Sequence, residues 1–203
     1  MDPLTACLNT RQGVGQKGAI PAAAARKSMK SHRMVPILSA GVAALAVLLL
    51  GANWPVPRLA AGMVADRVVV RKARHRLELY ARGKLLKDYV VSLGRHPEGR
   101  KEREGDQGTP EGWYAVEAHK PDSSFHRALK ISYPSAADRL AAEKRGVSPG
   151  GDIMIHGIRN GLAPLGRMQR WVDWTAGCVA VTNPEIEEIY RAVPDGTPVE
   201  FVP

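Results

Sequence analysis

The sequence has few cysteines and no recognisable set of metal ligands. Its 203 residues include two cysteines, Cys7 and Cys178, which lie on opposite sides of a long apolar run. Cysteines separated in this way cannot pair within a membrane-inserted chain, so no disulfide is expected. The six histidines show no paired spacing with a carboxylate, which argues against a zinc peptidase. No metal or cofactor is therefore expected.

Glycine-rich phosphate-binding loops and internal repeats are also absent from the sequence. The net charge is +9 at pH 7, but residues 1–34 alone carry six basic side chains and one acidic side chain. From residue 66 onward, 22 basic residues stand against 19 acidic residues. Because the basicity lies mostly in the N-terminal tail, it does not indicate a nucleic-acid partner.

An uncharged apolar segment follows the basic tail. Residues 35–52 (VPILSAGVAALAVLLLGA) are 18 residues without a charge, which is about the minimum length for a transmembrane helix. Basic residues precede this segment, whereas only Arg58 follows it closely, so the positive-inside rule exports the rest of the chain. We predict a basic cytoplasmic tail (1–34), a transmembrane or signal-anchor segment (35–52), a linker (53–65) and an extracytoplasmic or periplasmic domain (66–203). A cleaved signal peptide is the alternative, because residues 59–62 (LAAG) could form a cleavage site.

The domain that follows has the pattern of a mostly-β fold. Short β-branched runs separated by turn residues predict strands at 68–70, 77–80, 89–93, 112–116, 128–132, 153–155, 179–181 and 199–202, the first three forming an antiparallel meander. Short helices are predicted over residues 136–144 and from Pro184, the latter with Asn183 as its N-cap. A long loop at residues 95–110 and the segment 120–126 either line a substrate groove or form a solvated charged surface.

One thiol and one imidazole form a candidate catalytic pair. Cys178 follows Gly177 in a predicted turn, and His156 stands at the end of an apolar run. A thiol with an imidazole base is the minimum equipment for nucleophilic acyl transfer. Gly177 would let backbone amides approach an oxyanion, Thr175 could support the turn, and the Gly157 carbonyl could hold the imidazole tautomer. Taken singly, the two residues also fit an inert buried cysteine and a satisfied core histidine.

Three ordered blocks of sequence resemble the L,D-transpeptidase (YkuD) family. They are residues 105–114 (GDQGTPEGWY), 153–157 (IMIHG) and 175–179 (TAGCV) followed by Thr182-Asn183, and the resemblance covers residues 66–203. It implies a catalytic β-sandwich with short helices, in which Cys178 is the nucleophile and His156 its base. The implied reaction acylates the thiol at meso-diaminopimelate of a peptidoglycan tetrapeptide stem and releases D-alanine. An amine of another stem or of a wall-linked lipoprotein then accepts the acyl group, which cross-links or remodels the cell wall.

The sequence departs from the family pattern at two positions. Ala176 stands where the cysteine box of the family usually has a histidine, and Ala180, two residues after the cysteine, stands where the family commonly has an arginine. Candidates for substrate binding are therefore the nearby cations and one aromatic residue, namely Arg159, Arg167, Arg170 and Trp174. The altered box also resembles a branch related to murein–lipoprotein amidases, so peptidoglycan hydrolysis and a non-catalytic wall-binding module remain alternatives. A papain-like protease is disfavoured because its cysteine precedes its histidine.

Overall fold

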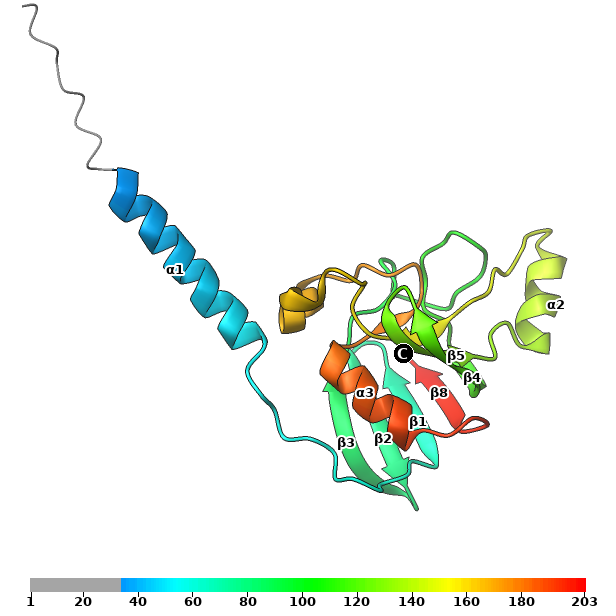
Figure 1. Ribbon diagram of the computed structural model, residues 1–203. Coiled ribbons are helices and arrows are strands. Elements are labelled where there is room, and N and C mark those ends of the chain that lie inside the picture. Colours follow the sequence, from blue (N-terminus) through cyan, green and yellow to red (C-terminus); the bar gives the residue numbers. More distant parts are fainter. Residues whose placement is uncertain (1–33) are drawn as a thin grey trace, which may run out of the picture. The chain divides into compact units, whose positions relative to one another are not determined.

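The computed structural model describes residues 34–203 (Figure 1). The predicted basic tail, apart from its last residue, and Cys7 lie outside these residues. Helix α1 (Met34–Ala52) coincides with the predicted apolar segment. Within residues 34–203, no helix has both the length and the apolar character needed to cross a bilayer. Residues 40–203 form one compact unit.

Eight strands form the centre of this unit, and the prediction of a mostly-β domain with short helices is confirmed. They are β1 (Arg67–Arg71), β2 (Arg76–Ala81), β3 (Lys84–Val90), β4 (Gly112–Ser123), β5 (His126–Ile131), β6 (Met154–His156), β7 (Val179–Ala180) and β8 (Pro198–Val202). Their order in the sheet is β3-β2-β1-β8-β4-β5-β6-β7. Strands β1 to β3 form the predicted antiparallel meander. The C-terminal strand β8 lies between β1, to which it is parallel, and β4, to which it is antiparallel.

The two edges of the sheet meet beside the candidate site. Strand β4 pairs with β8 at its beginning and with β5 further along, and register shifts after Val116 and Lys120 bend it. Beyond β3, the Ser92 N–H donates to the Ala180 carbonyl at 2.9 Å, and the Ala180 N–H donates back at 2.8 Å. These two bonds join the chain after β3 to β7, so the turn before β7 lies next to the loop that follows β3.

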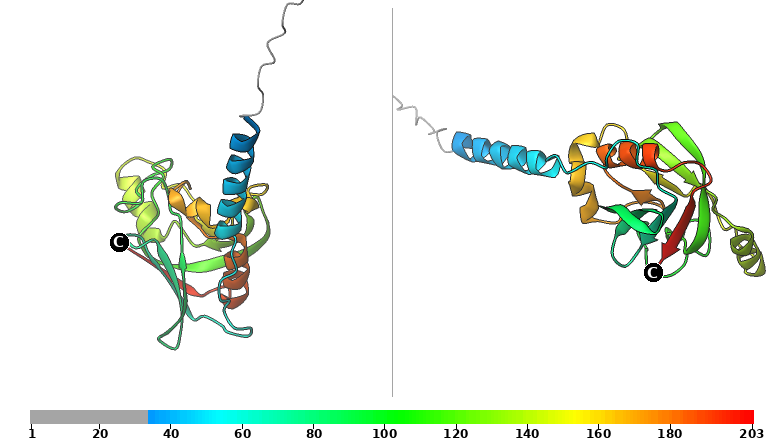
Figure 2. Two further views of the ribbon diagram at one scale, coloured as in Figure 1. Left: turned by 90° about the vertical axis from the view of Figure 1, so that its left-hand side faces the viewer. Right: turned by 90° about the horizontal axis from the view of Figure 1, so that it is seen from below.

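The apolar core lies inside the strands and under helix α3 (Asn183–Ala192). Alternate side chains are buried in β2 and β8, as expected for strands with one face against a core, whereas all three valines of β1 are buried. Ile186 and Ile189 of α3 are also fully buried, so this helix is part of the core (Figure 1). Helix α2 (Ala136–Lys144), which matches its predicted range, lies at the periphery of the domain in both views of Figure 2.

The start of α3 differs from the prediction. Thr182, not Asn183, is the N-cap: its N–H and hydroxyl donate to the Glu185 carboxylate at 2.9 and 2.7 Å. The Asn183 Oδ1 instead accepts the backbone N–H of Ile158 at 2.8 Å. Asn183 therefore ties α3 to the chain that leaves β6, two residues after His156.

Two further segments differ from the sequence-based prediction. Strand β3 begins at Lys84 rather than near residue 89, because Arg82 and Gly83, both with positive φ, form a tight turn directly after β2. The element η2 (Ala163–Trp171) was not predicted. It consists of short 3-10 turns joined at Gly166, whose φ is +48°, and its proline and glycine conceal the helical pattern in the sequence.

Candidate active site

Cys178 lies in a tight turn immediately before β7. Gly177 has φ +131°, a region that residues with a side chain rarely adopt. A Cβ at this position would lie 2.6 Å from the Gly108 carbonyl oxygen and 3.0 Å from Cδ1 of Ile153. The Thr175 hydroxyl donates to the Cys178 carbonyl at 2.8 Å and accepts the Gly177 N–H at 3.1 Å. The side chain of Thr175 therefore supports the turn on both sides of the thiol, in the way expected from the sequence.

His156 ends strand β6, which runs parallel to β7. The register places His156 opposite Ala180, and Cys178 comes directly before β7, so the imidazole and the thiol come from neighbouring strands. The Nδ1 atom of His156 lies 2.7 Å from the Gly157 carbonyl oxygen. Because a carbonyl can only accept, Nδ1 carries the hydrogen and Nε2 keeps the lone pair. Both side chains line the same pocket.

The surroundings of the pair favour its uncharged form. Burial raises the pKa of the Cys178 thiol above its ordinary value. Burial also lowers the pKa of His156 to about 4, although the hydrogen bond to the Gly157 carbonyl acts in the opposite direction. The thiol donates to the Asp152 carbonyl at 3.5 Å. At neutral pH a neutral thiol and a neutral imidazole therefore share one pocket, and the imidazole is in the form that can accept a proton.

Two aromatic rings hold the imidazole of His156. The ring centroid of Phe125 lies 4.4 Å from that of His156, and the ring of Trp174 meets the imidazole edge-on at 5.7 Å. The indole Nε1 of Trp174 donates to Oε1 of Gln169 at 2.8 Å, which fixes the orientation of the indole. Trp174 was a candidate from the sequence. Phe125 was not singled out, although it lies in the segment 120–126, for which lining a substrate groove was one of two alternatives.

The pair opens into a largely apolar pocket of about 660 Å³. Its apolar lining comes from η2 and the adjoining chain and includes Ile158, Leu162, Leu165, Met168 and Val172. Arg95 and Arg159 add positive charge to this lining. A cavity of this size and lining suits part of a peptide substrate with a carboxylate. Within residues 34–203, no group of three or more His, Cys, Asp or Glu side chains is placed to hold a metal ion.

Two of the arginines suggested by the sequence do not line this pocket. Arg167 donates to the backbone carbonyls of residues 51, 52 and 54. Arg170 forms an ion pair with Glu185 at 2.5 Å, and both of these side chains are largely buried. Of the three candidate cations, Arg159 is therefore the one that reaches the pocket.

The two departures from the family pattern have structural consequences. Ala180 is fully buried in β7, where its backbone pairs with Ser92, so an arginine side chain there would have to be accommodated in the core. Ala176 is exposed and lines the pocket, so this position places no second imidazole beside Cys178. Arg95, from the loop after β3, also lines the pocket, but the sequence pattern did not identify it as a candidate cation.

The first sequence block forms a loop that packs against the nucleophile turn. The Asp106 carboxylate accepts Nζ of Lys101 at 2.6 Å and the backbone N–H groups of residues 102, 103 and 108. Burial alone would raise the pKa of Asp106, but these hydrogen bonds outweigh it and lower the pKa to about 2. The loop then places the Gly108 carbonyl against Gly177, while the Thr109 hydroxyl accepts the Gly94 N–H at 3.0 Å. The block therefore shapes the turn that holds the thiol.

Replacing Thr175 with valine is expected to weaken the turn that holds Cys178. The side chain is 4% exposed, and removing its hydroxyl leaves two buried backbone groups without a partner, at a cost of about 1–3 kcal/mol. The free energy of unfolding should fall by that amount, and turnover should fall about tenfold or more because the thiol is less well positioned. Urea titration and product analysis measure both effects. Thr197→Val, at another buried threonine away from the pocket, is the control, and equal turnover in the two variants would contradict the role of Thr175.

The low pKa of His156 predicts an acid-sensitive stability. The unfolded chain binds a proton on this histidine below pH 6.5, whereas the folded chain resists it down to about pH 4. Folding therefore loses stability progressively as the pH falls from 6.5 to 4, by about 3 kcal/mol in total. The variant His156→Gln lacks this titration, so its free energy of unfolding should fall by about 3 kcal/mol less over the same range. Denaturant titrations at each pH measure the free energy of unfolding. An equal loss of this free energy between pH 6.5 and pH 4 in the two proteins would contradict the prediction.

Comparison with known proteins identifies the family. The model of the YkuD family, the L,D-transpeptidase catalytic domain, matches residues 65–201. This range is most of the chain and contains all eight strands except the last residue of β8. The chain therefore belongs to the L,D-transpeptidase (YkuD) family.

One related sequence and one solved structure are similar to this chain. YafK of Escherichia coli (strain K12), whose full name is "Putative L,D-transpeptidase YafK", is 31% identical over 132 residues, which are 62% of this chain and 46% of YafK. The chain thus spans about half the length of this relative. The crystal structure of Pgp2, a helical cell shape determining protein from Campylobacter jejuni, superimposes with a TM-score of 0.53 at 24% identity. It covers 77% of this chain and 54% of Pgp2, and at this identity the likeness is one of fold.

Proposed function

We propose that this chain is a cysteine L,D-transpeptidase that acts on the stem peptides of peptidoglycan. The observation that carries the proposal is the arrangement of Cys178 and His156, which come from neighbouring strands and line one pocket. Thr175 holds the turn of the thiol, and the Gly157 carbonyl holds the imidazole tautomer. These are the parts required for acyl transfer through a thioester. The family membership of residues 65–201 supports the same chemistry.

In the first half-reaction, the Cys178 sulfur attacks the carbonyl carbon of meso-diaminopimelate that is bonded to the terminal D-alanine. Nε2 of His156 takes the thiol proton and passes it to the departing D-alanine nitrogen as the C–N bond breaks. The Gly177 N–H already donates to Thr175, so the Cys178 N–H is the backbone donor assigned to the oxyanion. Arg159 and Arg95 are proposed to bind carboxylates of the stem from the pocket wall.

In the second half-reaction, an amine attacks the thioester, His156 takes its proton, and the thiol is regenerated. Hydrolysis is the second candidate, because it differs only in that water replaces the amine. The observation that favours it is Ala176, a short side chain that is exposed and lines the same pocket as the thiol. The amine would come from another stem or from a wall-linked lipoprotein.

This function requires a location at the cell envelope. The basic tail and the uncharged segment 35–52 precede the catalytic domain, and we propose that this leader, as a signal or as an anchor, directs the domain to the outer side of the membrane. If the leader is kept as an anchor, extraction of membranes with alkaline carbonate should leave the protein in the pellet. Release into the supernatant with residues 35–52 still present would contradict the anchor.

The test is incubation of the purified full chain with disaccharide-tetrapeptide, followed by mass measurement of the products. Transpeptidation should give a cross-linked dimer and free D-alanine. Hydrolysis should give free D-alanine and a monomeric tripeptide product only. If no D-alanine is released while the protein still binds peptidoglycan, the chain is a wall-binding module and the catalytic proposal is wrong.

A further inference from the structure

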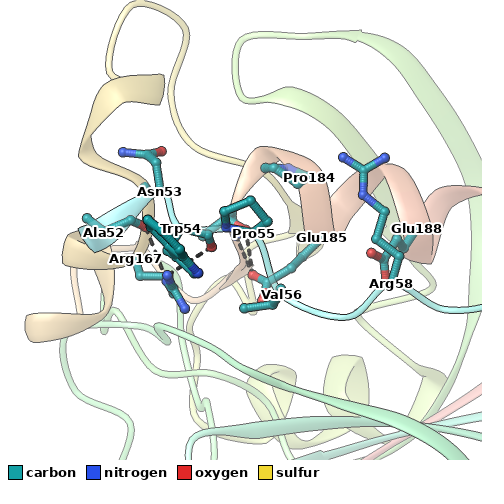
Figure 3. A pocket seen from close by; sticks show the side chains of 12 residues that line it. Ala52, Asn53, Trp54, Pro55, Val56, Arg58, Arg167, Pro184, Glu185 and Glu188 are labelled. Carbon is teal, nitrogen blue, oxygen red and sulfur yellow. Dashed lines mark hydrogen bonds between the residues drawn. The ribbon is translucent and has the colours of Figure 1, made fainter. Parts of the chain in front are cut away.

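The chain that leaves helix α1 packs against η2, the element that lines the active-site pocket (Figure 3). Arg167 of η2 holds this contact through three hydrogen bonds. Its Nη2 donates to the carbonyls of Gly51 at 2.8 Å and Trp54 at 3.0 Å, and its Nε donates to the carbonyl of Ala52 at 3.2 Å. The last carbonyls of a helix have no partner within the helix, and a cation is favoured beside them. Arg167 therefore caps the end of α1.

Asn53 makes the same connection from the other side. Its Nδ2 donates to the Leu49 carbonyl of α1 at 2.8 Å and to the Pro164 carbonyl of η2 at 2.9 Å. One amide group thus bridges the two elements. The hydrogen bonds of Arg167 and Asn53 run in both directions between the two segments, so neither segment can shift without breaking several of them.

Gly166 allows the close approach of the two backbones. Its φ is +48°, and a Cβ at this position would lie 2.6 Å from Oδ1 of Asn53 and 2.7 Å from the carbonyl oxygen of Ala52. The second of these contacts is with backbone, which cannot move aside as a flexible side chain can. A glycine at residue 166 is therefore required both by the backbone conformation and by the contact with the end of α1.

The other side of η2 faces the catalytic pair. Leu165, Met168 and Gln169 line the pocket that contains Cys178 and His156. The Gln169 carbonyl accepts the Ser92 hydroxyl, and its Oε1 accepts the Trp174 indole N–H, both at 2.8 Å. The indole in turn packs edge-on against the imidazole of His156. A continuous set of contacts therefore runs from the end of α1 through η2 to the general base.

We infer that Arg167 is a positioning residue, which uses the segment from Leu49 to Trp54 to hold the η2 wall of the substrate pocket in place. This inference rests on the proposed function for its kinetic consequences. It makes the end of α1 a part of the active domain rather than a passive tether. Cleavage at residues 59–62, as in a signal peptide, would remove the partner of Arg167 and loosen the pocket wall.

The kinetic test compares Arg167→Ala with the control Arg139→Ala in the full chain, using disaccharide-tetrapeptide. Arg139 also donates to a backbone carbonyl, that of Pro134, but it lies in helix α2. Arg167→Ala is expected to raise KM about tenfold with a smaller change in kcat, because the wall and not the thiol is disturbed. Arg167→Lys, which keeps a donor and the charge, should recover part of the loss. An unchanged KM in Arg167→Ala would overturn the inference.

A second measurement does not depend on turnover. In hydrogen exchange of the full chain, the amides of residues 162–172 should exchange faster in Arg167→Ala and in Gly166→Ala than in the wild type. In Arg139→Ala these amides should exchange at the wild-type rate. The rate at which iodoacetamide alkylates Cys178 should stay near the wild-type rate in Arg167→Ala. Unchanged exchange of residues 162–172 would overturn the positioning role even in an active enzyme. If the wild-type chain releases no D-alanine but the exchange changes as expected, the proposed function fails and the structural coupling stands.

Discussion

Replacement of Cys178 by alanine should reduce D-alanine release from the tetrapeptide by at least about a thousandfold, to the background rate. The thiol is the only nucleophile assigned to the reaction, and without it no thioester can form. The side chain is partly buried and its turn is held by Thr175 and Gly177, so the fold should survive the change. Chromatographic measurement of D-alanine against time, with a denaturation curve for each protein, separates loss of chemistry from loss of structure.

The matched control for this experiment is Cys7→Ala. The sequence places Cys7 on the other side of the apolar segment, and it lies outside the described residues. This variant should keep the wild-type rate. A fully active Cys178→Ala variant, or an inactive Cys7→Ala variant, would contradict the assignment of the nucleophile.

Replacement of His156 by glutamine should lower kcat by about a hundredfold to ten-thousandfold, the usual worth of a positioned general base. Because burial lowers the pKa of this imidazole to about 4, the wild-type rate should begin to fall, through protonation of His156, only as the pH approaches 4. Glutamine cannot take the thiol proton, so this acid limb should be absent from the variant. Rates measured across pH 4 to 8 test the magnitude and the shape together.

His119 offers a matched control for His156. Its Nε2 also bonds to a backbone carbonyl, that of Tyr190 at 2.9 Å, but it lies outside the pocket and its Nδ1 faces Asp195. His119→Gln should leave kcat and the pH profile unchanged. Equal losses in the two variants would show that the effect at His156 is structural and not catalytic.

The sequence was most informative where local patterns determine the structure. Short β-branched runs separated by turn residues predicted the β1–β2–β3 meander, and helix α2 was placed at its correct bounds. Long-range pairing could not be read in this way. Nothing local in Val199–Val202 indicates that this segment inserts between β1 and β4, because such pairing depends on the closure of the whole sheet.

The same contrast holds for the site. The motif around Gly177 and the thiol predicted a supported turn, and the hydrogen bonds of Thr175 are of the expected kind. The wall of the pocket was not predicted, because Pro164 and Gly166 interrupt the helical pattern of η2 and its direction depends on Gly166. Arg167 looked like a substrate cation from its position between the motifs. Its actual partners lie more than a hundred positions earlier in the sequence, and no local pattern links them.

The most direct test of the catalytic role of Cys178 is the mass of the protein itself during turnover. The full chain, mixed with disaccharide-tetrapeptide and quenched in acid, should gain the mass of the disaccharide-tripeptide acyl group. Peptide mapping should place this group on the fragment that contains Cys178, and the Cys178→Ala variant should show no gain. Release of D-alanine without any adduct on Cys178, or with the adduct on another residue, would contradict a thioester at this cysteine.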